Sequence, residues 1–264
     1  MVRFVHISDT HLRGDVDHVH YGHRPYASLK QLVSTINALP YAFDFVLHTG
    51  DVVDDEQPES YANAKTILSE LRVPVRYIVG NHDHAGLLQQ TMVGIASPAA
   101  RYDYAFELGG VQFVALDSTS LHEQPGGELT TAQLEWLRAY CQPEGQPLAV
   151  FVHHQPLPLG VPWLDAVITM PSAMIISNHA AFRAVLRPAA NRLRGVFFGH
   201  IHRSSQSVED GIFYSSAPST FGQLKTWPEQ RAPLPAPEEA PGYSLVTIDG
   251  GRTIVQQYTF ARPA

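Results

Sequence analysis

The sequence predicts an α/β fold, and three observations support this class. Short apolar runs rich in β-branched and aromatic residues recur up to residue 200. Segments with helical periodicity separate them, and polar clusters follow most of the runs. Strand-like runs that alternate with helical segments indicate buried, partly parallel sheets. The six predicted strands are 3–8, 43–50, 75–80, 111–118, 148–154 and 195–200.

Four segments between these strands are predicted helices: 26–38, 57–71, 130–141 and 179–187. The third begins after Thr130, whose hydroxyl suits an N-cap. After residue 205 the pattern changes to short strands around 206–216, 243–249 and 252–259. The turn "DGGR" predicts that the last two strands form a hairpin.

The chain of 264 residues shows no internal repeat and no change of composition before residue 218, so we predict a single domain over residues 1–264. Within it, residues 225–241 contain five prolines in their last fourteen positions. Proline removes the backbone donors that a central strand needs. We therefore expect a Pro-rich arm or loop at about 218–241, over the site or against a partner subunit.

Composition excludes several classes of protein. No run approaches the ~18 apolar residues of a membrane span, and the N-terminal segment does not have the pattern of a secretory signal. A single cysteine, Cys141, excludes an intramolecular disulfide and favours a cytoplasmic location. The formal net charge of −7, without a basic block, argues against a large nucleic-acid footprint.

Polar clusters end five of the six apolar runs. Ligand sites in open α/β sheets form at the carboxyl ends of strands, so these clusters predict one site rich in nitrogen and oxygen ligands. His200 and His202 are two residues apart and would point to the same side of an extended segment. The clusters are Asp9 and His11; Asp51; Asn81, His82 and Asp83; His153 and His154; and His200 and His202.

Each cluster alone also has an ordinary structural explanation. "GD" and "GNHD" fit turns, because Gly, Asn and Asp favour them, and a short motif such as "DTH" is common by chance. Five such motifs at the same end of successive strands favour a joint site.

In order along the chain, "DTH" (9–11), "GD" (50–51), "GNHD" (80–83), "HH" (153–154) and "GHIH" (199–202) resemble the motifs of calcineurin-like metallophosphoesterases. The resemblance implies a four-layer α-β-β-α sandwich: two mixed sheets flanked by helices. It also implies two metal ions at the carboxyl ends of the strands.

The same resemblance implies a ligand set for each ion, with Asp51 bridging the two. Nitrogen and oxygen ligands suit transition metals, with Fe and Mn expected first and Zn or Co as alternatives. Two such ions neutralise phosphate oxygens and acidify a bound water, which then attacks phosphorus as hydroxide. The first set is Asp9, His11, Asp51 and His202, and the second is Asp51, Asn81, His153 and His200.

Two further residues are expected to take part in catalysis. The resemblance places His82 beside the phosphate, where it would protonate the leaving oxygen or hold a phosphoryl oxygen. Asp83 would accept the other N–H of His82. His154 is expected behind the metal ligands, and His23, in the loop after the first motif, at the edge of the pocket.

Protein phosphatases of this family carry arginines where this chain has Asp55 and Val79, which favours diesters over doubly charged monoesters. The stretches 153–165, 215–223 and 240–251 resemble the bacterial class III cyclic nucleotide phosphodiesterase and glycerophosphodiesterase branch. Trp163, Phe221 and Trp227 are candidates for stacking on a base, although core packing or a dimer contact also explains them.

We therefore expect a dinuclear-metal phosphodiesterase that hydrolyses small diesters such as 3′,5′-cyclic AMP or related cyclic nucleotides. A glycerophosphodiesterase or a broad-specificity phosphodiesterase is the alternative, and a non-catalytic scaffold of the same fold is a third. The expected partners are a small phosphodiester substrate and further copies of the chain in a homodimer or higher oligomer, with no membrane.

Overall fold

The computed structural model describes residues 1–120, 126–166 and 174–263. Its first sheet has the strand order β13-β12-β1-β2-β3. β1, β2 and β3 are parallel, whereas β12 and β13 form an antiparallel hairpin beside β1, as the sequence predicted. The strands are β1 (Val2–Ile7), β2 (Phe45–His48), β3 (Val75–Tyr77), β12 (Gly242–Asp249) and β13 (Arg252–Thr259).

The second sheet has the order β4-β5-β6-β7-β9-β8. Its four inner strands are parallel, and its edge strands β4 and β8 are antiparallel to their neighbours. The strands are β4 (Tyr104–Leu108), β5 (Val111–Ala115), β6 (Leu148–Phe151), β7 (Leu193–Phe198), β8 (Gln206–Glu209) and β9 (Ile212–Ser216).

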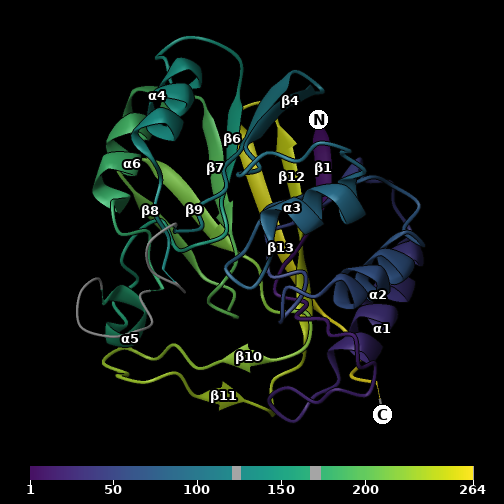
Figure 1. Ribbon diagram of the computed structural model, residues 1–264. Coiled ribbons are helices and arrows are strands. Elements are labelled where there is room, and N and C mark those ends of the chain that lie inside the picture. Colours follow the sequence, from purple (N-terminus) through teal and green to yellow (C-terminus); the bar gives the residue numbers. More distant parts are fainter. Residues whose placement is uncertain (121–125, 167–173, 264) are drawn as a thin grey trace.

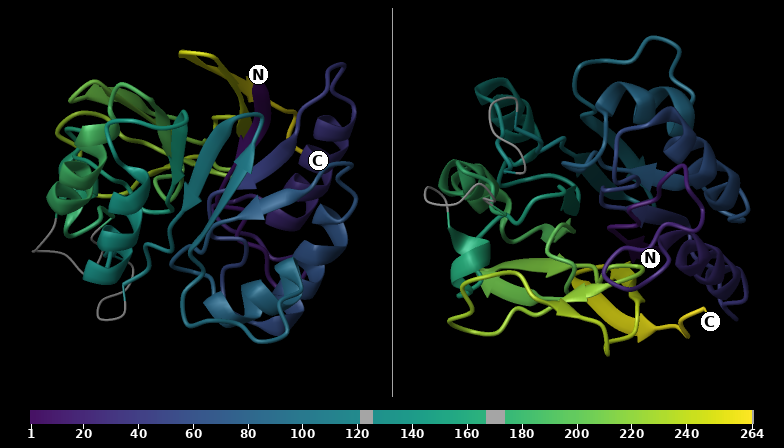
Figure 2. Two further views of the ribbon diagram at one scale, coloured as in Figure 1. Left: turned by 90° about the horizontal axis from the view of Figure 1, so that it is seen from above. Right: turned by 60° about the horizontal axis from the view of Figure 1, so that its bottom comes forward.

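Three apolar clusters separate four layers. Phenylalanines from both sheets, including Phe4, Phe45, Phe113 and Phe151, fill the space between the sheets. The outer face of the first sheet packs on α1 (Pro25–Asn37) and α2 (Pro58–Leu68), and that of the second on α4 (Thr131–Tyr140) and α6 (His179–Leu186). The two helix pairs lie on opposite sides of the sheets (Figures 1 and 2). The predicted four-layer sandwich is confirmed.

Local sequence explains why these elements form. In α1, Leu29, Leu32, Val33 and Ile36 recur at helical spacing and are buried against the sheet. The helices α1 and α2 both begin with proline, whose fixed φ suits the first helical position. In α4, Thr130 forms the predicted N-cap as part of a capping box. β6 is buried along its whole length, as expected for a parallel strand covered on both faces.

The structure contains elements that the sequence analysis missed. β4 is an edge strand that joins β5 through Gly109 and Gly110, and its alternation of Tyr104, Phe106 and Leu108 was a usable signal. The predicted strand region 206–216 is a hairpin of two strands. The remaining additions are the short helices α3 (Ala85–Leu88) and α5 (Pro162–Asp165), a π-helix (Gln89–Val93) and a 3₁₀ turn (Arg187–Ala189).

The Pro-rich segment is ordered around a small antiparallel pair, β10 (Gln223–Leu224) and β11 (Pro235–Ala236). It crosses the lower part of the molecule beside α5 (Figure 1), where the backbone N–H of Trp163 donates to the Gln230 carbonyl oxygen at 3.2 Å. Among the described residues, none of the helices has the length and apolar character needed to cross a membrane.

Candidate metal centre

The predicted polar clusters lie together where the parallel strands of both sheets end. Nearly all of the clustered side chains are buried: Asp9 and His153 are 0% exposed and Asp51 is 1% exposed. Buried charges need partners or a bound ion, because desolvation disfavours an isolated charge. The structure brings together all seven side chains proposed as metal ligands: Asp9, His11, Asp51, Asn81, His153, His200 and His202.

Five of these seven residues have the left-handed backbone conformation. Their φ angles lie between 46° and 69°, a region that non-glycine residues rarely adopt. Each such residue costs on the order of 1–3 kcal/mol, and such strain concentrates at functional sites. The fold therefore holds these side chains in orientations that a relaxed strand end would not give them. The five are Asp9, His11, Asp51, His200 and His202.

The glycines of two motifs permit the close approach of the loops. A Cβ atom on Gly80 would lie 2.2 Å from Asp51 Oδ1, and one on Gly50 would lie 2.5 Å from His153 Nδ1. Neither approach is sterically possible, so any larger residue would push the ligands apart. This explains why glycine precedes Asp51 and Asn81 in the motifs "GD" and "GNHD".

The first group of ligands is Asp9, His11 and His202, which present nitrogen and oxygen atoms within 4.8 Å of one another. His11 Nδ1 faces the Asp54 carboxylate at 3.0 Å, and His202 Nδ1 faces the Gly222 carbonyl oxygen at 3.1 Å. Both Nδ1 atoms must therefore carry the proton. Burial lowers the pKa of His11 and of His202 to about 4, so both rings are neutral at pH 7.

This protonation leaves a lone pair on each Nε2 atom, and the two Nε2 atoms lie 3.0 Å apart. Two lone pairs repel at this distance, whereas a cation shared or bound beside them turns the repulsion into ligation. The His11–His202 pair thus fits a metal ion by the chemistry of its donor atoms.

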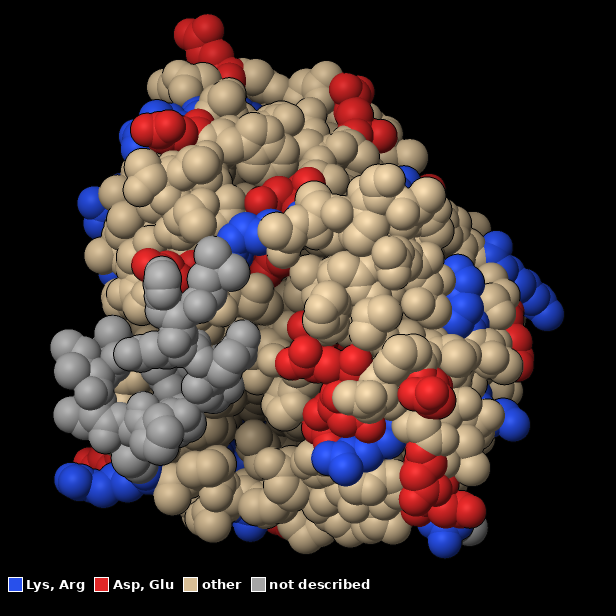
Figure 3. Space-filling model, in the orientation of Figure 1, with Lys and Arg blue, Asp and Glu red and all other residues tan. Residues whose placement is uncertain are grey.

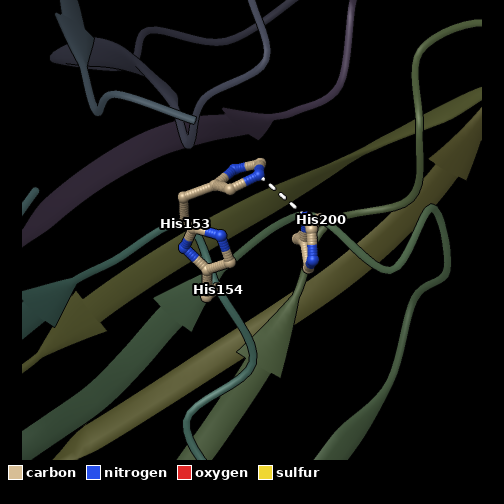
Figure 4. Close-up of side chains that lie close together, drawn as sticks. All are labelled: His153, His154 and His200. Carbon is tan, nitrogen blue, oxygen red and sulfur yellow. Dashed lines mark hydrogen bonds between the residues drawn. The ribbon is translucent and has the colours of Figure 1, made fainter. Parts of the chain in front are cut away.

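The second group surrounds His153 Nε2. Asn81 Oδ1 and His200 Nδ1 each lie 3.1 Å from it, and Figure 4 shows the rings of His153 and His200 facing each other. His153 Nδ1 donates to the Thr49 carbonyl oxygen at 2.7 Å. Burial lowers the pKa of His153, but the nearby Asp51 carboxylate more than offsets this effect and raises the pKa to about 9. The surroundings of Nε2 therefore favour a positive charge, which a metal ion supplies in place of a proton.

Asp51 lies between the two groups. Its Oδ2 atom is 3.5 Å from His11 Nε2 and 3.3 Å from His153 Nε2, while its Oδ1 accepts from the His82 backbone N–H at 2.9 Å. Burial alone would raise its pKa, but His153 and His82 hold the pKa of Asp51 well below its usual range. An ionised carboxylate between two sets of imidazoles is the arrangement that a bridging ligand requires.

The side chain next to His82 differs from the prediction. Asp83 does not contact the His82 ring: it accepts from the Val52 and Gly80 backbone N–H groups and from the Tyr61 hydroxyl. It joins the loops after β2 and β3, because its buried carboxylate satisfies donors from both. His82 Nδ1 instead lies 3.3 Å from the Asp54 carbonyl oxygen and 3.4 Å from Asp54 Oδ1.

Asp54 is the principal residue that sequence reasoning missed. Its carboxylate is 3% exposed, accepts from His11 Nδ1 at 3.0 Å and pairs with Arg13 at 2.6–2.7 Å. Burial opposes ionisation, but His11, His20 and Arg13 hold the pKa of Asp54 below its usual range. Asp54 stands three residues after the predicted ligand Asp51, and this spacing was the available signal.

The two accessory histidines have different surroundings. His154 is buried beside the second group, with its Nδ1 2.9 Å from the Ser118 hydroxyl and its ring centroid 4.6 Å from that of His200. His23 lies at a neighbouring cavity, and His20, three residues earlier, lines the cavity of the candidate centre.

A cavity of about 180 Å³ opens onto the candidate centre. Its polar lining consists of five of the proposed ligands together with His20, Tyr21 and His82; the five ligands are His11, Asp51, Asn81, His200 and His202. The rest of the lining is apolar and comes from α5, the Pro-rich segment and the loop before α6: Trp163, Met174, Leu224 and Pro233. Trp163 is 4% exposed, and its indole Nε1–H has no acceptor among the described residues.

Fold and site together define a phosphoesterase class. The profile described as calcineurin-like phosphoesterase matches residues 2–204, and the chain belongs to that family. Members use dinuclear metal centres, and the His/Asp clusters described above fit one.

Two relatives with similar sequences are both phosphodiesterases. The chain is 30% identical to a glycerophosphodiester phosphodiesterase of Enterobacter lignolyticus over 86% of this chain and 81% of the relative. It is 29% identical to a 3′,5′-cyclic adenosine monophosphate phosphodiesterase of Escherichia coli K12, over 85% and 78%. The expectation of a metal-dependent phosphodiesterase is confirmed at the level of this family and its relatives.

A solved structure supports the fold alone. A dimetal phosphatase from Danio rerio superimposes with a TM-score of 0.68 over 98% of this chain and 96% of that chain, at 17% identity.

Proposed function

We propose that the protein is a dinuclear-metal phosphodiesterase that hydrolyses small diesters with a bulky apolar group, 3′,5′-cyclic AMP and related cyclic nucleotides first among them. The observation that carries this proposal is the cavity, whose lining combines five of the candidate metal ligands with four apolar side chains.

In this proposal two ions share the ligands as the sequence implied. Asp51 bridges, because its Oδ2 lies within 3.5 Å of one histidine from each group. The nitrogen and oxygen donors suit Fe, Mn, Zn or Co. When bound, such ions supply positive charge for phosphoryl oxygens and the means to ionise water near neutral pH. The first set is Asp9, His11, Asp51 and His202, and the second is Asp51, Asn81, His153 and His200.

The protein groups around this centre suit a singly charged diester. None of the described residues that line the cavity is Lys or Arg. Arg13, which lies close by, already pairs with Asp54. The protein groups around the cavity would therefore neutralise the two negative charges of a monoester less completely than the single charge of a diester. Asp55 and Val79, where protein phosphatases of the family carry arginines, point the same way.

In this proposal His82 acts on the leaving oxygen. It lines the cavity, its side chain is 40% exposed, and its Nδ1 is held by Asp54. Burial lowers the pKa of His82, but Asp51 and Asp54 more than offset this and raise it above its usual value. A histidine protonated near neutral pH can donate a proton to a departing alkoxide.

The apolar lining favours a nucleobase over a glycerol group. An aromatic base gains from contact with an indole ring, by about 1–3 kcal/mol for stacking. The indole N–H of Trp163, which has no acceptor among the described residues, would additionally donate to an acceptor on that group. The relative from Enterobacter keeps glycerophosphodiesters as the second candidate class of substrate.

The charge and the exposed apolar residues of the surface bear on the proposed partners. On the face drawn in Figure 3, Lys and Arg side chains are scattered among acidic ones and form no extended basic surface, which suits a small-molecule substrate. We keep the homodimer or higher oligomer as a proposal for the exposed part of the Pro-rich segment, where Trp227 is 63% exposed and Leu234 is 52% exposed.

The test compares kcat/KM for 3′,5′-cyclic AMP, glycerophosphocholine, bis-p-nitrophenyl phosphate and p-nitrophenyl phosphate, with Mn and with Fe. We expect cyclic AMP above glycerophosphocholine, and the nitrophenyl diester above the monoester. Trp163→Phe, which removes the indole N–H and reduces the stacking area, should lower kcat/KM for cyclic AMP by about 10-fold and leave that for glycerophosphocholine, which has no aromatic ring, nearly unchanged. Trp227→Phe, in an exposed tryptophan, is the matched control. A preference for the monoester would refute the proposal.

A further inference from the structure

A second cavity of about 240 Å³ lies beside the candidate centre, and none of the seven proposed metal ligands lines it. Its walls come from three segments: the turn before α1 with the first turn of that helix, the loop after β9, and the C-terminal segment. The residues that define it are His23, Arg24, Ser28, Phe221 and Arg262.

The charged side chains that line this cavity are all basic. Among the described lining residues there are two arginines and a histidine, and none is acidic. The nearest acidic partner of Arg24 is Asp17 at 3.9 Å, and both side chains are more than half exposed. Such a pair is worth little in water, so it leaves the charge of Arg24 available.

No carboxylate among the described residues lies within ion-pair distance of Arg262. Its two terminal nitrogens donate to the backbone carbonyl oxygens of Pro237 and Glu239. Of the nearby described carboxylates, Glu239 pairs with Arg203 and Glu238 pairs with Lys225. The pKa of Glu238 is lowered first by a hydrogen bond to its own backbone and then by Lys225, and Arg262 contributes only a weaker share. These contacts orient the guanidinium group without neutralising it.

The cavity also lies at the N-terminal end of α1, whose first turn contains no acidic residue. The unpaired amides of a helix N-terminus favour an anion, which adds to the effect of the side chains. Burial, and then Arg262, lower the pKa of His23. The positive charges of His23 and Arg262 repel each other, so an anion bound between the two side chains would stabilise both charges.

Phe221 separates this cavity from the candidate metal centre. Its ring centroid lies 5.6 Å from those of His11 and His202 and 5.3 Å from that of His20. Backbone hydrogen bonds of 2.8 and 2.9 Å join His20 to His23, so one turn faces both cavities. A ligand in the second cavity would therefore touch the same ring and the same turn that border the metal centre.

We propose that this second cavity binds a small phosphate monoester, with the phosphate between Arg24, Arg262 and His23 and its substituent against Phe221. Two arginines suit a dianion, since guanidinium groups match phosphate oxygens in charge and geometry. The volume lies below the range typical of drug-sized ligands, which limits the substituent to a small group. This site does not depend on the proposed diesterase activity.

The probes are inorganic phosphate and phenylphosphonate, a dianion that cannot be hydrolysed, with benzoate as the singly charged match. Zinc-loaded protein keeps histidine NMR signals sharp, and the His23 ring signal is assigned with the variant His23→Gln. We expect phosphate and phenylphosphonate to shift this signal to saturation. Benzoate should bind at least about 10-fold more weakly, since one charge-assisted hydrogen bond is worth roughly that factor or more.

The double variant Arg24→Ala/Arg262→Ala should abolish the His23 shift. Phosphate should still inhibit this variant at the metal centre. The Ki for phosphate in a bis-p-nitrophenyl phosphate assay should stay within about 2-fold of wild type, because neither arginine lines the cavity at the candidate metal centre. Arg252→Ala, in an arginine whose side chain is 75% exposed on β13, is the control and should leave the shift intact.

Three outcomes would overturn the assignment: no shift of the His23 signal at phosphate concentrations that saturate the metal centre, an undiminished shift in the double variant, or equal affinity for benzoate and phenylphosphonate. An inactive protein that still shows the His23 shift would refute the proposed function and leave this site standing.

Discussion

Replacing Asp54 by asparagine should weaken one metal site and leave the other intact. The Asp54 carboxylate accepts from His11 Nδ1 at 3.0 Å with one oxygen and from Arg13 Nε at 2.7 Å with the other. An asparagine has only one acceptor oxygen, so either His11 or Arg13 would face its NH₂ group. His11 then loses the partner that holds its proton on Nδ1 and its lone pair on Nε2.

The magnitude follows from that geometry. Loss of the partner that orients a ligating histidine typically costs about 10- to 100-fold in metal affinity, which corresponds to about 1.4–2.8 kcal/mol. Only the ion held by His11 should be affected, because the ligands of the other group, such as His153 and Asn81, do not contact Asp54.

The assay is calorimetric titration of Mn²⁺ into metal-depleted protein, with kcat/KM measured at increasing free metal. Asp54→Asn should show one weakened site, and excess metal should restore most of the activity. Asp55→Asn is the matched control: Asp55 bonds Ser60 and the Gln57 N–H at the start of α2 and faces neither ligand group. Wild-type affinity at both sites in Asp54→Asn, or equal weakening of both, would refute the positioning role.

Three further results are expected. Asp51→Asn should reduce activity by several orders of magnitude even in excess metal, and His11→Ala should do less, since it removes one ligand from one site; equal small losses would contradict the bridging role. His82→Ala should slow cyclic AMP hydrolysis by ~10²–10⁴-fold more than bis-p-nitrophenyl phosphate hydrolysis, because an alkoxide needs a proton to leave; equal losses with both metals retained would indicate a role in holding a phosphoryl oxygen. The free energy of unfolding should fall as pH decreases from about 6.5 towards 3. Burial lowers the pKa of His6 and of His48 from 6.5 to about 3. In this pH range the unfolded chain therefore binds more protons than the folded protein, which favours unfolding. At about pH 5 each contributes roughly 2 kcal/mol of this loss, and urea denaturation of His6→Gln should show a shallower pH dependence than wild type.

The strand pattern and the convergence of the polar clusters were predictable from the residues, whereas the four-layer arrangement was implied by the resemblance of the motifs to a known family. Apolar runs such as "LAVF" in β6 identify strands covered on both faces, and parallel strands necessarily bring their carboxyl ends to one edge. Asp51 and His153 are 102 residues apart in the chain, yet each lies in the loop just after a parallel strand, so their proximity follows from topology. β4, an edge strand with a half-buried pattern, gave a weaker signal and was missed.

The partners of these side chains were not predictable, because they depend on contacts between loops that no local pattern encodes. Asp83 and Asp54 are both acidic residues in motif loops, and only the packing of the loop after β2 against that after β3 decides that Asp54 faces His82. The positive φ of the metal-site residues and the contact of the Pro-rich segment with Trp163 likewise arise from tertiary packing. By itself, then, the sequence determined which residues end the strands and which chemistry they offer. Tertiary structure decided which of them meet and what lines the cavity, because those contacts join loops far apart in the chain.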